Sequence, residues 1–362
     1  MKKNMFYFFF VMMLGAFILS GCGKTDTSSD KKSTENSTTG ACPTDSKTAK
    51  GEIQSFFYTA NEGGSISKID AQTYDVIETI KVEGIVHNVQ VSPNGKLVGA
   101  TVVPEMNHEG GHSMEMHGKA VFYDTVTNDL IHEVEVGNHP AHIVFTENGK
   151  YSLVTNNEDN NVSVIDLNNY TITQTISTGK GPHGFRISKD SKFAYIANMG
   201  EDTVSVLNLE SFSEEKKIKV GSTPVTTALT SDGKTLFVTL NSENAVAIVD
   251  LISGEISKIK VGIGPAQVYI QADNQFAFIA NQGTEDAPSN SVTKIDLRKK
   301  EVVATINTGK GSHGVVTSPD NQYVYVTNMV DNTVSVIDNE QNKVIETIEV
   351  DRVPNGISVM PE

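Results

Sequence analysis

Residues 179–190 have the sequence GKGPHGFRISKD, and residues 309–320 have the closely similar sequence GKGSHGVVTSPD. Each stretch is followed by a short apolar segment that ends in asparagine, YIAN at 195–198 and YVTN at 325–328. Variants of the same unit recur from residue 53 to the end of the chain. Self-similarity at a nearly fixed period indicates a repeat fold, in which each unit is one supersecondary structure.

Each repeat contains four short runs of alternating or β-branched residues, separated by turn signals, which predicts four strands. The first strand of each unit begins near one indexed position, and these positions are His87, Ala141, His183, Val225, Ala266, His313 and Asn355. Seven four-stranded units arranged in a ring predict an all-β fold, a seven-bladed β-propeller over residues 53–362. The chain opens with a typical second strand, Phe56–Asn61, and ends with a typical first strand, Gly356–Val359. We therefore expect both termini to complete one blade and close the ring, which leaves few free strand edges.

The YVTN segment and its variants resemble the YVTN β-propeller repeat family of bacterial and archaeal surface proteins and lipoproteins. The resemblance covers about residues 53–360. It implies the propeller fold, but it leaves the function open, because that family includes binding, scaffold and enzyme members.

The amino-terminal segment has the features of a secretory signal. Two lysines precede the apolar run Met5–Leu19, which is followed by Ser-Gly-Cys. This ending resembles the lipobox of bacterial lipoproteins, which implies that residues 1–21 are a signal peptide and that Cys22 is lipidated. Residues 22–52 are rich in Ser and Thr and poor in large apolar residues, which predicts a flexible tether. We therefore expect a protein lipid-anchored to the cell membrane through Cys22 and facing outside the cytoplasm.

Composition narrows the classes of partner. The net charge of −15 disfavours nucleic acid, which binds to basic surfaces. Two cysteines exclude a framework of several disulfides. The same charge disfavours adsorption to anionic lipid headgroups by charge alone.

Histidines gather at one predicted face of the disc. Strands that run up and down place the second turn of each blade, and the crossover to the next blade, on the same face. His87, His183 and His313 share the indexed position, at the predicted rim of the central channel. His139 lies in a crossover of the same face, and His142 is offset by one residue from the shared position. In a strand, that offset is expected to direct His142 to the opposite side.

A long insertion in a second turn extends this cluster. Residues 104–117 have the sequence PEMNHEGGHSMEMH, and they are expected on the same face as the crossovers. Thioether sulfur favours Cu(I), whereas imidazole suits several transition metals, so the mixture of His and Met favours copper over zinc. The candidate metal ligands of this loop are Met106, His108, His112, Met114, Met116 and His117.

The sequence thus predicts a transition-metal-binding propeller, with copper favoured and a metal donor, metal acceptor or redox protein as its partner. A second hypothesis is a redox or cofactor enzyme, because histidines at the mouth of a propeller are similar in layout to the copper-cluster propeller of nitrous oxide reductase and the haem d1 propeller of nitrite reductase. A third is a surface interaction scaffold without metal, since copying of repeats can also multiply histidines. A metal-dependent lyase or lactonase is a fourth, for which the sequence shows no nucleophile and base pair.

Overall fold

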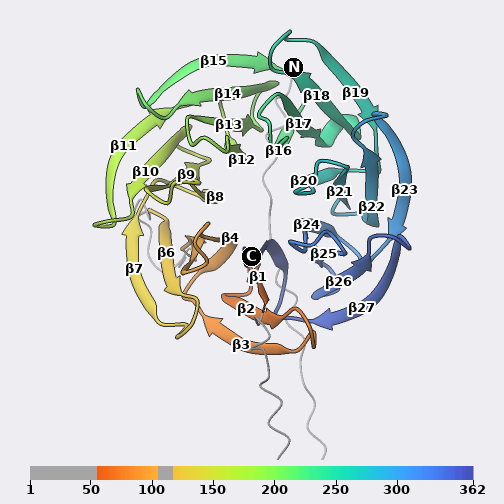
Figure 1. Ribbon diagram of the computed structural model, residues 1–362. Coiled ribbons are helices and arrows are strands. Elements are labelled where there is room, and N and C mark those ends of the chain that lie inside the picture. Colours follow the sequence, from red (N-terminus) through yellow and green to blue (C-terminus); the bar gives the residue numbers. More distant parts are fainter. Residues whose placement is uncertain (1–54, 105–116, 362) are drawn as a thin grey trace, which may run out of the picture. The chain divides into compact units, whose positions relative to one another are not determined.

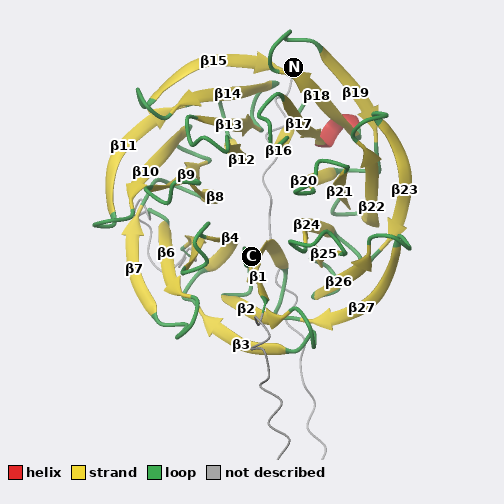
Figure 2. Cartoon of the chain, viewed as in Figure 1, coloured by secondary structure: helices red, strands yellow, loops and turns green. Residues whose placement is uncertain are grey.

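The computed structural model of the chain describes residues 55–104 and 117–361. These residues form seven four-stranded antiparallel sheets arranged in a ring (Figure 1). The predicted seven-bladed, all-β propeller is confirmed. Figure 2 shows strands throughout the ring, and the short 3-10 helix η1 (Asn241–Glu243) is the exception among the described residues. In that part of the chain, no helix has the length and apolarity required to span a lipid bilayer.

Each blade consists of four strands, ordered from the centre of the ring outward. Blades I to IV are β28 (Pro354–Val359), β1 (Phe56–Asn61), β2 (Ser65–Asp70) and β3 (Val76–Lys81); β4 (Ile85–Val91), β5 (Leu97–Val103), β6 (Lys119–Asp124) and β7 (Leu130–Glu135); β8 (Pro140–Phe145), β9 (Tyr151–Asn156), β10 (Asn161–Asp166) and β11 (Thr171–Ser177); and β12 (Pro182–Ile187), β13 (Phe193–Asn198), β14 (Thr203–Asn208) and β15 (Ser213–Lys219). Blades V to VII are β16 (Pro224–Leu229), β17 (Thr235–Leu240), β18 (Ala245–Asp250) and β19 (Ile256–Lys260); β20 (Pro265–Ile270), β21 (Phe276–Gly283), β22 (Pro288–Asp296) and β23 (Glu301–Asn307); and β24 (Ser312–Thr317), β25 (Tyr323–Asn328), β26 (Thr333–Asp338) and β27 (Lys343–Glu349).

Blade I is completed by both ends of the propeller sequence, as predicted. The last strand, β28, pairs antiparallel with the first, β1, so that Tyr58 lies opposite Ser358. Phe57 of β1 also stacks on Tyr325 of blade VII, with ring centroids 4.4 Å apart. Backbone pairing and aromatic packing therefore join the two ends of the ring.

The hydrophobic core lies between neighbouring blades. The second and third strands carry apolar residues on both faces, because each sheet packs face to face against two others. One cluster combines fully buried Leu153 and Val164 of blade III with fully buried Phe185 and Ile196 of blade IV. Runs of β-branched and apolar residues suit strands that are covered on both sides.

The turns between second and third strands share one face of the disc with the crossovers between blades. The backbone N–H of Glu62, in the β1–β2 turn, donates to Val353 O in the crossover before β28 at 2.9 Å. The N–H of Met199, after β13, donates to Gly181 O in the crossover before β12 at 2.8 Å. We call this side of the ring the upper face. The parity of strands predicted from the sequence is confirmed.

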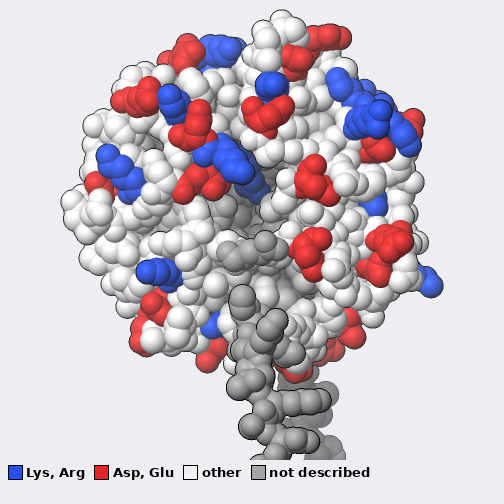
Figure 3. All heavy atoms as spheres, in the orientation of Figure 1, with Lys and Arg blue, Asp and Glu red and all other residues white. Residues whose placement is uncertain are grey.

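The surface charge is mixed rather than segregated. On the face seen in Figure 3, Asp and Glu side chains alternate with Lys and Arg around the ring, and the surface is recessed near its centre. A surface of this kind offers no continuous basic footprint on that face.

Candidate metal centre

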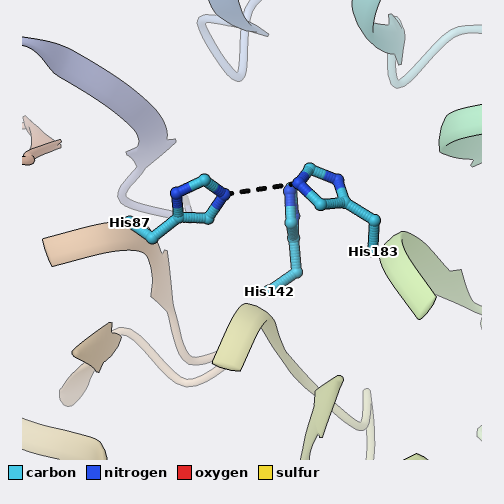
Figure 4. Close-up of side chains that lie close together, drawn as sticks. All are labelled: His87, His142 and His183. Atoms are coloured by element: carbon cyan, nitrogen blue, oxygen red, sulfur yellow. Dashed lines mark hydrogen bonds between the residues drawn. The ribbon is translucent and has the colours of Figure 1, made fainter. Parts of the chain in front are cut away.

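Three histidines from the inner strands of three consecutive blades meet at the inner wall of the ring. His87 lies in β4, His142 in β8 and His183 in β12. One ring nitrogen from each lies within 4.8 Å of the others (Figure 4). The Nε2 atoms of His87 and His183 are 3.3 Å apart. We call His87, His142 and His183 the three-histidine cluster.

His142 joins the cluster although it is offset from the shared position. The side chains at its equivalent position in three other blades, Asn88, Thr226 and Gln267, accept hydrogen bonds from the inner strand of the following blade. The position therefore faces around the ring, and for His142 the following blade carries His183, with ring centroids 4.9 Å apart. The expectation that the offset would separate His142 from the other histidines is wrong, because inner strands present this position to their neighbour.

In His87 and His183, a hydrogen bond holds Nδ1, the ring nitrogen that does not face the other histidine. His183 Nδ1 lies 3.2 Å from Val225 O, and His87 Nδ1 lies 3.0 Å from Glu62 Oε1. A carbonyl and a carboxylate only accept, so each Nδ1 donates a proton, and Nε2 of each ring is directed inward. The Nε2 of His142 is buried and has no hydrogen-bond partner among the described residues. The Nε2 atoms of His87 and His183 face each other at 3.3 Å, so a proton or a metal ion is needed between them.

Glu62 stands behind His87 in blade I. Its side chain is 13% exposed, and Oε1 also accepts a 2.7 Å hydrogen bond from Asn355 Nδ2. Burial raises the pKa of Glu62, but the hydrogen bonds from His87 and Asn355 outweigh burial and hold this pKa below its ordinary value. The carboxylate is therefore charged, and it orients and polarises the His87 ring.

The environment keeps the other cluster histidines neutral. Burial, followed by the neighbouring imidazoles, lowers the pKa of His142 and of His183 well below the ordinary value. Metal binding requires the neutral imidazole. The same burial that disfavours protonation therefore preserves the ligand form of these two side chains.

Two more predicted ligands lie near the cluster without joining it. The His139 ring is 6.4 Å from the His87 ring, is about half exposed, and has Nδ1 3.7 Å from Glu158 Oε1. Its pKa is lowered by burial and then by His87. His313 in β24 is 5% exposed, its Nδ1 has no partner among the described residues, and burial lowers its pKa to about 4.

The ends of the insertion flank the cluster. At its start, Val103 pairs with Ile85, two residues before His87. At its end, His117 is exposed, and the N–H of Gly118 donates to Gly137 O at 3.1 Å, in the crossover that leads to His142. His117 thus lies on the upper face, as predicted. The other predicted ligands Met106, His108, His112, Met114 and Met116 lie outside the described residues, as does Cys22.

No individual role for Glu62 or Asn355 follows from the sequence alone. Glu62 is one of many acidic residues in second turns, and Asn355 occupies the shared position without being a usual metal ligand. Their role follows from ring closure, which brings blade I beside His87. In the sequence, the signal for this contact is an acidic residue in the second turn of one blade followed by a histidine at the indexed position of the next blade.

The comparisons with known proteins identify the fold. Residues 121–361 match the model of a family described as a YNCE-like beta-propeller. No protein of curated function matches the sequence. Hydrazine synthase of Kuenenia stuttgartiensis is similar in structure, with a TM-score of 0.67 and 20% identity over 76% of this chain and 90% of that chain. A candidate 6-phosphogluconolactonase of Bacteroides fragilis has a TM-score of 0.68 and 14% identity over 86% of this chain and 99% of that chain.

At these identities the likeness to solved structures shows the fold alone. The family match supports the predicted propeller repeat. The narrower YVTN label and the lipoprotein assignment stay predictions.

Proposed function

This chain belongs to the YNCE-like β-propeller family, and we propose that it binds a transition metal ion, with copper favoured, through His87, His142 and His183. The observation that supports this proposal is the convergence of three imidazoles with one ring nitrogen each inside 4.8 Å. Three imidazole ligands suit copper, zinc, nickel or iron. The fold itself does not assign this function, because propellers carry many activities.

The surroundings of the cluster have the features of a metal site. Metal-bound histidines commonly donate the second ring nitrogen to a carboxylate or a backbone carbonyl, which fixes the tautomer and the ring orientation. His87 has this contact with Glu62, and His183 has it with Val225 O. Nε2 of His142 is buried without a hydrogen-bond partner among the described residues, which costs free energy. A metal ion bound to this nitrogen would offset that cost.

The preference for copper rests on the insertion. Its two described ends, Val103 and Gly118, lie beside the strand of His87 and the crossover that leads to His142. Thioether ligands favour Cu(I), and zinc rarely uses them. A site with fixed imidazoles and a loop rich in Met suits transfer of copper to or from a partner protein.

A second candidate is a redox or cofactor enzyme. Three protein ligands leave a coordination position open, which is typical of catalytic rather than structural metal sites. His87 remains 15% exposed, so solvent reaches the edge of the cluster. An interaction scaffold without metal is the remaining alternative, and it would require no particular nitrogen geometry.

Metal titration of the metal-free mature domain tests the proposal. We expect one tightly bound ion per chain with Cu(I) or Cu(II), and loss of binding in the triple variant His87→Ala, His142→Ala, His183→Ala. His132→Ala, in the outer strand β7, is the matched control and should bind as the parent does. Binding of the parent weaker than about micromolar, or unchanged binding in the triple variant, would rule the site out.

The proposed location is the outer surface of the membrane, with Cys22 as the lipid-anchored residue. Tethering there would let the propeller exchange metal with soluble partners. Cys22→Ser should move the protein from the membrane fraction to the soluble fraction, and mass spectrometry of the parent should show an acylated amino-terminal cysteine. A parent protein found soluble and unacylated would contradict the anchor while leaving the metal site untouched.

A further inference from the structure

Six crossovers, all within the described residues, hold one residue in the same conformation on the upper face. In each, the carbonyl oxygen two residues before the indexed position accepts a hydrogen bond of 2.8–3.1 Å from a backbone N–H at the end of the second strand of the same blade. Each of these residues has a positive φ, between 49° and 72°. They are His139, Gly181, Thr223, Gly264, Gly311 and Val353. The backbone therefore fixes where this residue lies, whatever its side chain.

His139 is the member of this set whose side chain can bind a metal ion. Glycine suits a positive φ because it has no Cβ, so a histidine at this position carries a conformational cost. Further contacts hold its crossover: the N–H of Gly137 donates to Asn156 Oδ1 at 3.1 Å, and the N–H of Asn138 donates to Asp159 Oδ2 at 2.8 Å. The His139 ring therefore projects from a firmly held segment of backbone.

His139 lies between solvent and the three-histidine cluster. Its ring centroid is 6.4 Å from that of His87, and the His87 ring is in turn 5.4 Å from that of His183. The side chain of His139 is 48% exposed and that of His87 is 15% exposed, whereas His142 is buried. The imidazoles therefore form a series that runs from solvent to the buried nitrogens.

His139 and Glu158 are spaced so that one metal ion can contact both. Their Nδ1 and Oε1 atoms are 3.7 Å apart, which is too long for a hydrogen bond. A metal–nitrogen bond and a metal–oxygen bond add up to about 4 Å for an ion of the size of Zn(II). The Glu158 side chain is 66% exposed, so water competes for the ion at this pair. The pair is therefore suited to brief binding rather than to storage.

We infer that His139, together with Glu158, is the entry site through which the metal ion passes from solvent to His87 of the three-histidine cluster. This inference rests on the proposed metal-binding function. The transfer is a ligand exchange, in which the bond from the ion to the His139 nitrogen breaks as a bond to His87 Nε2 forms. The ion keeps its charge, and no proton or electron is transferred. His87 Nδ1 donates to Glu62, so Nε2 of His87 carries the lone pair that the ion requires.

An entry site changes the rates of metal binding and not the affinity. The ion enters and leaves by the same route, so loss of His139 slows association and dissociation by the same factor. Loss of a ligand that holds the bound ion has a different effect, because it speeds dissociation and weakens binding at equilibrium. Kinetic measurements therefore distinguish the two roles.

Stopped-flow quenching of tyrosine fluorescence by Cu(II) measures association with the metal-free protein, and an EDTA chase extrapolated to zero chelator measures dissociation. His139→Gly removes the ring and suits the positive φ, so the variant should fold as the parent does. We expect both rate constants to fall by about tenfold and Kd to stay within a factor of about three. Glu158→Gln should slow both steps less. Thr223→Gly makes the same change at the equivalent position of blade V, and it should match the parent.

The triple variant of the cluster tests the entry site separately. It lacks tight binding but retains His139 and Glu158, so added Cu(II) should exchange rapidly at this pair. In NMR spectra of that variant, the ring protons of His139, identified by their absence in His139→Gly, should broaden at lower Cu(II) concentration than those of exposed His132.

Equal association rate constants for His139→Gly and the parent would overturn the inference and leave the metal centre itself standing. Faster dissociation in His139→Gly would also overturn it, since His139 would then hold the bound ion. Equal broadening of His132 and His139 in the triple variant would show that the pair with Glu158 has no preference for the ion, and would overturn the entry site as well. A parent protein that binds no metal would overturn the proposed function and this inference together.

Discussion

The Nε2 atoms of His87 and His183 lie 3.3 Å apart, although the strands that carry them belong to blades II and IV. Blade III separates these two strands in the ring, and it contributes His142 to the same point. Two nitrogen lone pairs at this distance repel, so the contact is favourable only with a proton or a metal ion between them. The geometry that ring curvature imposes on three neighbouring strands is therefore suited to holding a cation.

Glu62 is expected to strengthen metal binding without touching the ion. Glu62→Gln keeps an oxygen acceptor for His87 but removes the charge that polarises the ring. We expect metal affinity to fall by about 10- to 100-fold, as for other partners of metal-bound histidines. Competition with a chelator measures this change, and Glu158→Gln, beside His139 and mostly exposed, is the control. Equal affinities for Glu62→Gln and the parent would show that the carboxylate has no such role.

His313 is expected to make the metal-free fold sensitive to acid. Its pKa in the folded protein is about 4, against an ordinary value of 6.5, because burial disfavours the charged ring. The unfolded chain therefore binds a proton between these two values that the folded chain does not, and stability falls as the pH drops from about 6.5 to about 4. The free energy of unfolding should decrease by on the order of 3 kcal/mol from this residue.

The replacement His313→Gln removes this titration. Urea unfolding of EDTA-treated protein at several pH values should show a shallower loss of stability in the variant than in the parent. Some acid sensitivity should persist, because the pKa values of His142 and His183 are also lowered. Parallel profiles for variant and parent would contradict the assignment of His313.

Two buried lysines are expected to clamp neighbouring blades together. Lys68 Nζ in β2 donates to Thr125 O at 2.6 Å and to Asn128 Oδ1 at 3.2 Å in the β6–β7 turn of the next blade. Lys294 in β22 makes the equivalent contacts with Asn339 O at 2.7 Å and Asn342 Oδ1 at 2.9 Å. Each lysine is 5% exposed and lies over an aromatic ring.

Lys68→Met should lower the free energy of unfolding by roughly 2 kcal/mol, because the hydrogen bonds from a charged group are lost and Thr125 O keeps only the 3.4 Å hydrogen bond from the Tyr58 hydroxyl. Lys119→Met removes an exposed ion pair with Glu133, and should change stability by less than about 1 kcal/mol. Urea denaturation compares the two. A loss for Lys68→Met no larger than that for Lys119→Met would show that the clamp is not stabilising.

The repeat pattern was enough to predict the fold, the closure of blade I and the shared face of the second turns and the crossovers. These features depend on strand count and parity, which a repeating sequence displays directly. The contacts of each histidine side chain could not be predicted from the repeat pattern. His142 was expected to face away, because its direction depends on how inner strands meet around the ring rather than on alternation within one strand.

The loop is expected to select the metal rather than to create the site. Val103 and Gly118, at the two described ends of the insertion, lie beside β4 and the crossover to β8. We expect Met106, Met114 and Met116 to supply soft ligands to the metal. Replacing the three methionines by leucine keeps the length and the apolar volume of the loop but removes its soft ligands. We expect Cu(I) affinity to fall at least tenfold, a change of about 1.4 kcal/mol, whereas Zn(II) affinity stays within a factor of about three. Competition titrations with Cu(I) and Zn(II) chelators measure both, and equal losses for the two ions would mean that the loop supports the fold of the site and does not supply ligands.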